Sequence, residues 1–539
     1  MRTTTRRAVL GAGIAAAGSG LLAACSKGGG PSDGPSPTAA PAGYVTPDGK
    51  EVAAAEAARA GAGSVREVRL TATPARLDLG GGRTVASWAY GDVLPGKEIR
   101  VTAGDTLALT LANHLPEPTS LHWHGLALRN DMDGVPDLTQ RAVRAGASHA
   151  YRFKVTHPGT YWIHPHSGTQ QDRGLYAPLI VEDPKEPLEY DKEWVVVLDD
   201  WVDGIDGSTP DAVLAELAKG MSGMDHGGGG TGHGGAGHGA GHGGGHDMSH
   251  MSMTSAKASP SPTGPSRMLM GATSDVLGGD AGDVAYPHYL INGRTPEDPE
   301  TFTAKPGDRV RIRLINAGGD TAFRVALGDH RMTVTHADGF PVEHTATDAL
   351  LLGMGERYDV LVEAKDGAFP LTALAEGKKR TGLAVLRTGG GSAPGADTRP
   401  RELESTPLTA GLLKADASVR LKERRPDRTV TLRLTGSMAK YDWAINGRKY
   451  TPGQRYPVRA GERVRLVFVN DTTMWHPMHL HGHTFALPGG GPRKDTAIVL
   501  PGKRLEADFD ADNPGLWMLH CHNVYHAESG MMAVLGYRS

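Results

Sequence analysis

A stretch of about eleven residues occurs three times along the chain, and this repeat constrains the fold more than any other feature. Each copy has a Gly-Asp or Gly-Glu turn and then an alternating or apolar run that ends in asparagine, as expected of a β-strand. The copies occupy residues 103–113, 306–316 and 460–470. Copies so far apart indicate three homologous domains and not a solenoid.

The composition agrees with an all-β protein. Glycine makes up 74 of 539 residues, and glycine is disfavoured inside helices. Many short strands between Gly and Pro turns are typical of Greek-key sandwiches. We therefore predict three tandem Greek-key β-sandwich domains at 63–187, 188–395 and 396–539. With 57 basic and 60 acidic residues, the near-balance of charge argues against a nucleic-acid-binding chain.

The first 25 residues have the pattern of an export signal. Arg6 and Arg7 precede an apolar run, as in a secretory signal, and residues 5–10 resemble a twin-arginine signal. Leu22 to Cys25 resemble a bacterial lipobox, which predicts lipidation of Cys25 and anchoring to the outer face of the cell membrane. Residues 26–62 are predicted to be a flexible tether. The alternative is an ordinary signal peptide with a chance cysteine.

Histidine pairs recur at matching positions in the first and third copies. One pair lies nine and eleven residues beyond the repeat asparagine, and a second lies five and seven residues beyond a later Pro-Gly turn. These pairs are His122 and His124, His164 and His166, His479 and His481, and His520 and His522. The same offsets in the middle copy give Val325, Leu327, Thr372 and Leu374.

Such pairs predict a metal cluster. Residues i and i+2 of a strand point to the same side of a sheet, so each pair can present two imidazoles in one direction. Four pairs could converge between domains one and three, and imidazole suits copper or zinc better than hard cations. A single His-x-His is more often a pair of surface histidines, but four in register leave that alternative little room.

The third copy carries a second candidate site around Cys521. If His520 and His522 point one way along the strand, Cys521 points the other way. His476 lies upstream, and His526 and Met531 follow. A cysteine, two histidines and a weak axial methionine are the ligands of a blue-copper electron-transfer centre. The backbone of Cys521 would then connect this centre to the cluster.

These motifs make the chain resemble the three-domain multicopper oxidases of the laccase and copper-efflux-oxidase type. The resemblance covers residues 63–539 apart from an insert, and it rests on four motifs: His-Trp-His-Gly (122–125), Ile-His-Pro-His (163–166), His-Pro-Met-His-Leu-His-Gly (476–482), and His-Cys-His-(x)3-His-(x)4-Met (520–531). It implies cupredoxin-like domains and four copper ions per chain. By position it implies a type 1 copper on His476, Cys521, His526 and Met531, a type 2 copper on His122 and His479, and two type 3 coppers on His124, His164 and His522 and on His166, His481 and His520.

The resemblance also implies the reaction. Four one-electron oxidations of a substrate, Cu(I) or a phenol, are coupled to reduction of O2 to water. Asp133 matches a carboxylate that such enzymes use for proton delivery, although it could be an exposed turn residue. Relatives often carry a glutamate directly after the second type 1 histidine, whereas here Ala527 stands there and Glu528 follows. Glu528 is therefore a second candidate proton relay.

Two further features point to copper as the substrate. Met474 matches a methionine that copper-efflux oxidases use for a cuprous ion, although a packing methionine is the simpler interpretation. Residues 221–253 contain six histidines and five methionines among many glycines. We predict an insert at about 205–283 that is disordered and collects copper. The alternative is a neutral linker expansion.

Three functions remain to be compared. A cuprous oxidase serving copper tolerance and a laccase acting on phenols or aromatic amines would share one active centre. A copper-sequestering lipoprotein without enzyme activity is disfavoured by the complete ligand set, and a two-domain-type nitrite reductase would lack the paired type 3 histidines. Because one chain holds both halves of the cluster, a monomer would suffice.

Overall fold

The three repeats fold into three β-sandwiches, and the repeat strand takes the same place in each. These strands are β4 (Thr106–Asn113), β14 (Arg309–Asn316) and β25 (Arg463–Asn470). Each pairs in parallel with the first strand of its own domain: β1 (Val65–Gly80), β9 (Lys192–Trp201) or β22 (Arg428–Thr435). This computed structural model, which describes residues 43–223 and 264–539, confirms the predicted all-β architecture.

Two sheets form each sandwich. Domain 1 has the strand orders β2-β1-β4-β6 and β3-β8-β7-β5, domain 2 has β12-β9-β14-β19-β16-β17 and β13-β21-β20-β15-β18, and domain 3 has β23-β22-β25-β30-β27-β28 and β24-β32-β31-β26-β29. The other strands of domain 1 are β2 (Arg83–Tyr90), β3 (Ile99–Thr102), β5 (His122–His124), β6 (Ser148–Lys154), β7 (Gly159–His164) and β8 (Ala177–Glu182). Those of domain 2 are β10 (Thr273–Ser274), β11 (Gly279–Asp280), β12 (His288–Ile291), β13 (Thr301–Thr303), β15 (Phe323–Leu327), β16 (Met332–Ala337), β17 (Phe340–Thr347), β18 (Leu350–Leu352), β19 (Arg357–Glu363), β20 (Ala368–Ala375) and β21 (Arg380–Arg387). Those of domain 3 are β23 (Ala444–Ile445), β24 (Tyr456–Val458), β26 (His476–Leu480), β27 (Phe485–Ala486), β28 (Arg493–Lys494), β29 (Thr496–Val499), β30 (Arg504–Asp510), β31 (Leu516–Cys521) and β32 (Met532–Tyr537).

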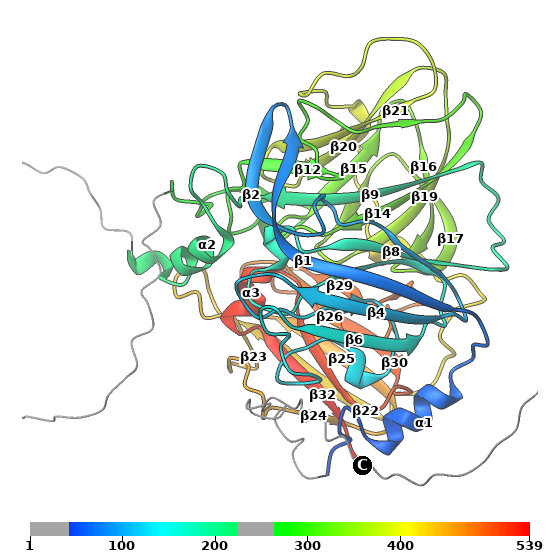
Figure 1. The fold of residues 1–539 in the computed structure, drawn as a ribbon, viewed down its shortest axis with the longest axis vertical. Helices are drawn as coiled ribbons and strands as arrows, with labels where there is room; N and C mark the ends of the chain where they lie inside the picture. Colours follow the sequence, from blue (N-terminus) through cyan, green and yellow to red (C-terminus); the bar gives the residue numbers. More distant parts are fainter. Residues whose placement is uncertain (1–42, 224–263) are drawn as a thin grey trace, which may run out of the picture. The chain divides into compact units, whose positions relative to one another are not determined.

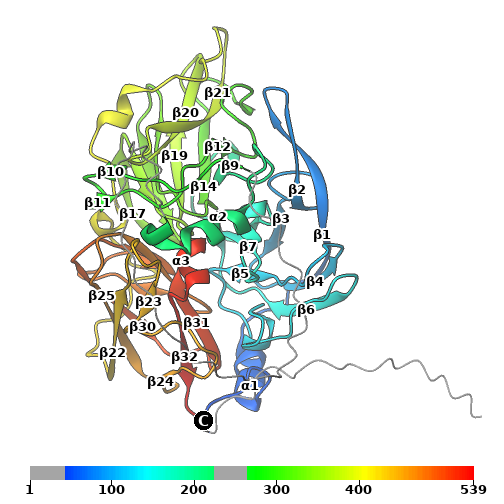
Figure 2. The same cartoon turned by 90° about the vertical axis from the view of Figure 1, so that its left-hand side faces the viewer.

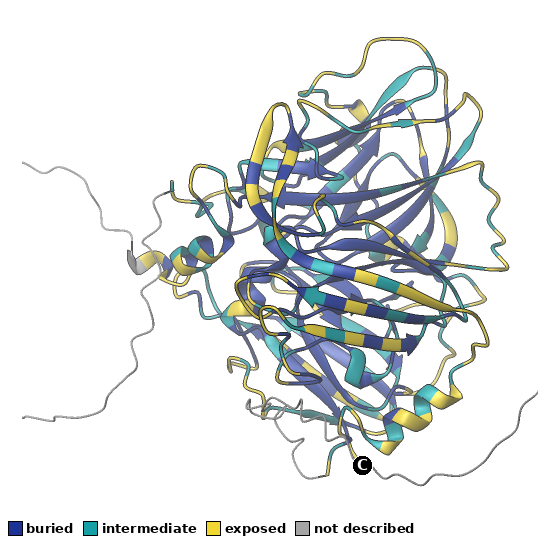
Figure 3. Cartoon of the chain, viewed as in Figure 1, coloured by how far each residue is buried: buried dark blue, intermediate teal, exposed yellow. Residues whose placement is uncertain are grey.

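Helices are few and short. They are α1 (Lys50–Ala58), α2 (Pro210–Leu217) and α3 (Val524–Ser529), with 3-10 turns η1 (Asn130–Met132), η2 (Gln171–Arg173), η3 (Gly220–Gly223), η4 (Arg401–Glu404) and η5 (Ala410–Leu412). Among the described residues, no helix has the length and apolar character needed to cross a membrane. Figure 3 shows buried strands through the interior, whereas α1 and the strands β1, β4 and β6 alternate between exposed and buried residues. That alternation is the pattern of a sheet with one face in solvent.

The asparagine at the end of each repeat strand makes the same three hydrogen bonds in every domain. Asn113, Asn316 and Asn470 are all buried. Each side-chain amide donates to two carbonyls from separate segments of its domain, and each side-chain oxygen accepts the N–H two residues ahead. We call this arrangement the asparagine brace. The carbonyls are those of Glu117 and Val143, Thr321 and Leu352, and Met474 and Val499, and the N–H groups are those of Leu115, Gly318 and Thr472.

Domains 1 and 3 meet directly. Figure 1 shows domain 2 above the other two, and Figure 2 shows domains 1 and 3 on the two sides of α3. Asn130 of domain 1 donates to the Leu516 carbonyl (2.7 Å) and accepts from the Leu516 N–H (2.8 Å). The Asn513 amide donates to the Leu128 carbonyl (3.0 Å). These bonds hold β31 of domain 3 against domain 1.

The predicted tether is too long. Residues 26–42 lie outside the described residues, but α1 and the chain after it pack on domain 1. Glu56 accepts the Lys154 N–H (2.8 Å), and Arg59 donates to the carbonyls of Ala127 and Leu128. The prediction is wrong over 43–62 because an alanine-rich segment is a good helix former and buries Val52.

The predicted disordered insert is also too long. The helix α2 forms within it because Thr209 caps the first turn by accepting the Ala212 N–H, and Val213 and Leu217 are buried. On the other flank, β10 and β11 pair with each other. Apolar residues and a capping signal in these flanks outweigh the polar composition. Residues 224–263, which contain most of the histidines and methionines, lie outside the described residues.

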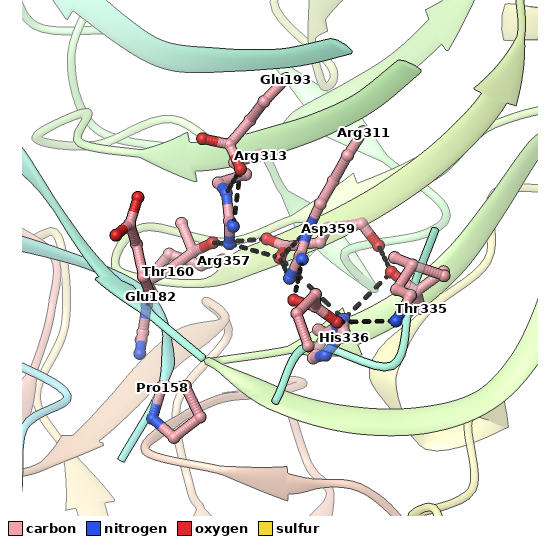
Figure 4. Close-up of polar contacts among 12 residues, drawn as sticks. Pro158, Thr160, Glu182, Glu193, Arg311, Arg313, Thr335, His336, Arg357 and Asp359 are labelled. Carbon is pink, nitrogen blue, oxygen red and sulfur yellow. Dashed lines mark hydrogen bonds and ion pairs between the residues drawn. The ribbon is translucent and has the colours of Figure 1, made fainter. Parts of the chain in front are cut away.

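A buried carboxylate links one sheet of domain 2 to domain 1. Figure 4 shows Asp359 of β19 between Arg311 and Arg313 of β14. Its Oδ2 accepts from Arg311 Nη2 (2.6 Å) and Arg313 Nη1 (3.0 Å), and its Oδ1 accepts from Thr160 of domain 1 (2.6 Å). Burial alone would raise the pKa of Asp359, but the two guanidinium groups hold this pKa well below its ordinary value.

We expect Asp359→Asn to destabilise the protein by about 3 kcal/mol at pH 7, because two buried guanidinium groups lose their counter-charge. A lowered native pKa gives stability that is present above the unfolded-state pKa of about 3.9 and is lost as the pH falls through the native value. The gap in thermal unfolding temperature between wild type and variant should therefore narrow below about pH 4. The control is Glu363→Gln, at an exposed position of the same strand. Equal stability of wild type and Asp359→Asn at pH 7 would contradict the prediction.

Candidate metal centre

Five of the eight paired histidines lie on adjacent antiparallel strands of domains 1 and 3, and the other three, His166, His481 and His522, lie one or two residues beyond the ends of those strands. In domain 1, β5 pairs with β7 so that His122 stands opposite His164. In domain 3, β26 pairs with β31 so that His479 stands opposite His520. The second histidine of each pair follows two residues later, and its ring joins the same cluster as the first. The contact between domains 1 and 3 then brings all four pairs together, as the sequence predicts.

The eight imidazoles form compact groups whose ligand nitrogens lie within 4.8 Å of one another. The closest approaches cross the domain boundary or join neighbouring strands: His522 Nε2 is 3.2 Å from His124 Nδ1, and His481 Nε2 is 3.2 Å from His520 Nε2. The groups are His124, His164 and His522; His166, His481 and His520; His122, His124 and His479; and His122, His164 and His166.

Most of these rings are anchored on one nitrogen and offer the other one inward. His122, His164, His479 and His520 contact backbone carbonyls through Nδ1, whereas His124 and His481 contact carboxylates. A carbonyl or carboxylate only accepts, so the anchored nitrogen carries the proton and the other nitrogen is a free lone pair.

The free nitrogens fit a metal. The Nε2 atoms of His122, His164, His166 and His479 are buried without a hydrogen-bond partner, and such atoms are costly unless something binds them. Burial first, and the neighbouring histidines second, hold the pKa of His164 and His166 well below its ordinary value. Neutral, close-set imidazoles are the donor set that copper and zinc prefer.

Two carboxylates orient the rings from behind. Asp133 Oδ2 accepts from His481 Nδ1 (2.9 Å), and the Asp133 carbonyl accepts from His122 Nδ1 (2.9 Å). Asp495 Oδ1 accepts from His124 Nε2 (3.0 Å). Burial alone would raise the pKa of Asp495, but the charge of Arg357 holds it well below its ordinary value. Such partners fix the tautomer and direction of metal-binding histidines.

The cysteine site is a separate buried group. Cys521 Sγ is 3.7 Å from His476 Nδ1 and 3.6 Å from His526 Nδ1, and the three residues form one candidate group. Met531 is fully buried, and its carbonyl accepts the Cys521 N–H (3.1 Å), so the two residues are neighbours. The structure thus brings together the residues of the predicted blue-copper site.

The outward nitrogens of the two histidines at the cysteine site are both hydrogen-bonded. His476 Nε2 is 2.8 Å from Thr472 Oγ1. His526 Nε2 is 2.9 Å from Asp283 Oδ2, and the Tyr441 hydroxyl donates to the same oxygen (2.9 Å). Both rings are completely buried. Direct contact between a solvent molecule and either ring is therefore blocked.

The other predicted residues take different places. Met474 is buried beside the site, and its backbone forms a bridge with Asp280. Glu528 lies on α3 but is exposed, and no contact between it and the cluster is seen among the described residues. One residue along a helix turns the side chain by about 100°, so Glu528 points outward while Ala527 takes the inward place. Cys25 lies outside the described residues.

Sequence reasoning missed Asp495, Asp283 and Arg357. Asp495 and Asp283 contact the histidines, and Arg357 contacts Asp495, each from a segment without a recognisable motif. The Lys-Asp-Thr stretch at 494–496 offered only a lone carboxylate. His483, which had no assigned role, contacts the His481 carbonyl (3.1 Å) and the Tyr537 hydroxyl (2.6 Å) behind the cluster.

Comparison with known proteins agrees with this geometry. Family models described as multicopper oxidase match residues 71–186, 269–391 and 423–538. The chain is 46% identical to Multicopper oxidase MmcO of Mycobacterium tuberculosis over 99% of this chain and 97% of that protein. It is 30% identical to the Copper resistance protein A homolog of Pseudomonas syringae pv. tomato, over 86% and 91% of the two chains. The crystal structure of a multi-copper oxidase from Pseudomonas thermotolerans superposes with a TM-score of 0.63 at 26% identity, covering 88% of this chain and 99% of that one. The chain therefore belongs to the multicopper oxidase family.

Proposed function

We propose that this oxidase binds four copper ions per chain, one at the cysteine site and three in the histidine cluster. The buried imidazole nitrogens that lack hydrogen-bond partners support this assignment. The proposed ligands are His476, Cys521, His526 and Met531 for type 1, His122 and His479 for type 2, and His124, His164 and His522 with His166, His481 and His520 for the type 3 pair. When bound, copper would supply one-electron acceptance at the cysteine site and reduction of O2 to water in the cluster.

The chain itself supplies the electron route between the two copper sites and the proton donor beside the cluster. Cys521 faces the type 1 ligands, and its sequence neighbours His520 and His522 face the cluster, so its backbone is a short covalent route between the two sites. Asp133 Oδ2, which accepts from His481 (2.9 Å), is the atom that would hold and deliver a proton beside the cluster. The buried rings keep bulk water away from both sites.

We propose Cu(I) as the working substrate. The observation that carries this proposal is that Thr472 and Asp283 occupy the outward nitrogens of His476 and His526, which leaves no free imidazole edge for a phenol hydroxyl. Met474 and Asp280 lie beside the site and offer a thioether and a carboxylate to a small cation. Relatives named for copper resistance agree with a role in copper tolerance.

We expect faster O2 uptake with a chelated Cu(I) donor than with a methoxyphenol, and loss of most of the Cu(I) rate when residues 221–253 are deleted. The length-matched control replaces the histidines and methionines of that segment with serine. If the serine variant loses the Cu(I) rate as the deletion does, the side chains and not the length matter. Dominant phenol turnover that neither change affects would favour a laccase and a neutral linker.

We also propose export by the twin-arginine route and a lipid anchor on Cys25. The support is the sequence pattern of residues 5–25. A lipid on Cys25 would hold the oxidase at the outer face of the cell membrane. We propose that it acts there as a monomer, with reduced copper and O2 as its partners. The Cys25 variant described in the Discussion tests this proposal.

A further inference from the structure

Domain 2 supplies none of the proposed copper ligands, yet one of its arginines reaches the back of the cluster. Arg357 begins β19 and is fully buried. Its guanidinium forks onto Asp495 of domain 3, with Nη1 to Oδ1 and Nη2 to Oδ2 both at 2.7 Å. Its Nε donates to the Thr160 carbonyl of domain 1 (3.1 Å), and Nη1 also donates to the Gly355 carbonyl (3.2 Å). The three domains therefore meet at this one side chain.

Asp495 passes this constraint to two cluster histidines. Its Oδ1 accepts from His124 Nε2 (3.0 Å) and lies 3.3 Å from His479 Nδ1, which also donates to the Asp495 backbone carbonyl (3.0 Å). The nitrogen that remains unprotonated on each ring is then His124 Nδ1, which faces His522 Nε2, and His479 Nε2, which has no hydrogen-bond partner. The Asp495 bonds therefore decide which nitrogen of each ring faces the cluster.

Two glycines allow this close approach. A Cβ on Gly125, whose φ is +90°, would lie 2.3 Å from Arg357 Nη2. A Cβ on Gly355, whose φ is +84°, would lie 2.9 Å from a carbon of His522 and 3.0 Å from a carbon of His124. Real side chains do not approach so closely. The backbone of domain 2 thus lies directly against the histidine rings.

We propose that Arg357 is a positioning residue for the histidine cluster and that, through the Asp495 carboxylate, it fixes the tautomer and direction of His124 and supports the direction of His479. This inference rests on the proposed copper ligands and gives domain 2 a part in the centre. A lysine would keep the charge but lose the planar fork that holds both carboxylate oxygens at once. The Asp495 carboxylate could then rotate away from His124 and His479, and His124 would no longer be held in one orientation.

The test compares Arg357→Lys with a matched control, Arg324→Lys. Arg324 also forks onto a carboxylate of domain 2, with Nε and Nη2 at 2.9 and 3.0 Å from Glu376. None of its hydrogen bonds within the described residues reaches a cluster histidine. Copper is titrated into the metal-free proteins against a chelator, and the copper content, the blue absorption of the cysteine site and the unfolding temperature are recorded.

We expect Arg357→Lys to bind the cluster copper about 10–100-fold more weakly, with an unchanged blue absorption and the same unfolding temperature as Arg324→Lys. Unchanged cluster affinity in Arg357→Lys would overturn the inference. So would an equal loss in Arg324→Lys, which would indicate a general effect of breaking an ion pair. If Arg357→Lys does not fold, Asp495→Asn replaces it with the same expected result.

A second readout separates this inference from the copper assignment. Long-range proton–nitrogen NMR spectra of the metal-free protein report which ring nitrogen carries the proton. Wild type should show His124 protonated on Nε2 and His479 on Nδ1, whereas Arg357→Lys should show mixed tautomers of His124 and leave His479 protonated on Nδ1. An unchanged His124 tautomer in the variant would overturn the inference. A wild-type chain that binds no copper would instead overturn the proposed function and leave this readout intact.

Discussion

Replacing Cys521 with serine is expected to abolish O2 uptake while the histidine cluster keeps its copper. The thiol lies 3.7 and 3.6 Å from the nearest nitrogens of His476 and His526, and a hydroxyl is a poor substitute for a thiolate as a ligand of copper. The cluster histidines are anchored independently, on carbonyls and carboxylates. We therefore expect copper per chain to fall from about four to three and the blue absorption to disappear.

The measurement is O2 uptake with a Cu(I) donor, together with copper content and visible absorption. Cys25→Ser, the same change at the other cysteine of the chain, serves as the control. It should keep full O2 uptake in the detergent-extracted protein and lose membrane association if Cys25 carries the lipid. A Cys521→Ser chain that still consumes O2 would contradict the electron route, and one that loses all its copper would contradict independent cluster assembly.

Asp133→Asn is expected to slow O2 reduction by about 10²–10⁴-fold, the usual contribution of a positioned acid or base. Asparagine has the same shape and can still accept from His481, but its amide cannot hold the proton that the carboxylate would. The Asp133 backbone carbonyl, which anchors His122, is unaffected by the change. Copper content and blue absorption should therefore remain those of wild type.

The check is the O2 uptake rate at saturating reductant across pH, in ordinary and heavy water. Asp131→Asn is the control, because Asp131 lies two residues away and pairs with Arg129 instead of a histidine. If the O2 uptake rate of Asp133→Asn falls by less than about threefold, the proton-delivery role is contradicted and Asp133 only orients the histidines. The same loss in both variants would point to a change in the shared loop.

The sequence predicts the ligand set because the information for it is local. Each histidine pair sits at a fixed offset from a repeat, and alternation along a strand determines where its rings point. The structure brings His122, His164, His479 and His520 together in the expected register. The same reasoning shows why the middle domain lacks the paired histidines, since Val325 and Leu327 occupy the corresponding places and are buried in its core.

The sequence does not predict the partners behind the ligands, because those contacts join segments far apart. Asp495 contacts a histidine 371 residues away, and Asp283 contacts one 243 residues away. Each is one carboxylate among 60 acidic residues, with no repeat to mark it. Glu528 stays a prediction, because it lies one position beyond the buried Ala527 on α3 and is exposed. The composition of residues 26–62 and 205–283 likewise does not predict the helices α1 and α2, because these helices depend on a few buried apolar side chains.

The asparagine brace occurs unchanged in domain 2, which supplies none of the proposed ligands of the cysteine site or the histidine cluster. Asn316 keeps all three hydrogen bonds of Asn113 and Asn470, so the brace belongs to the closing of the sandwich and not to the chemistry. Building the scaffold and installing the redox chemistry are thus separate tasks in this chain. It follows that the three sandwiches can fold before copper binds, and that copper then enters a site that is already formed.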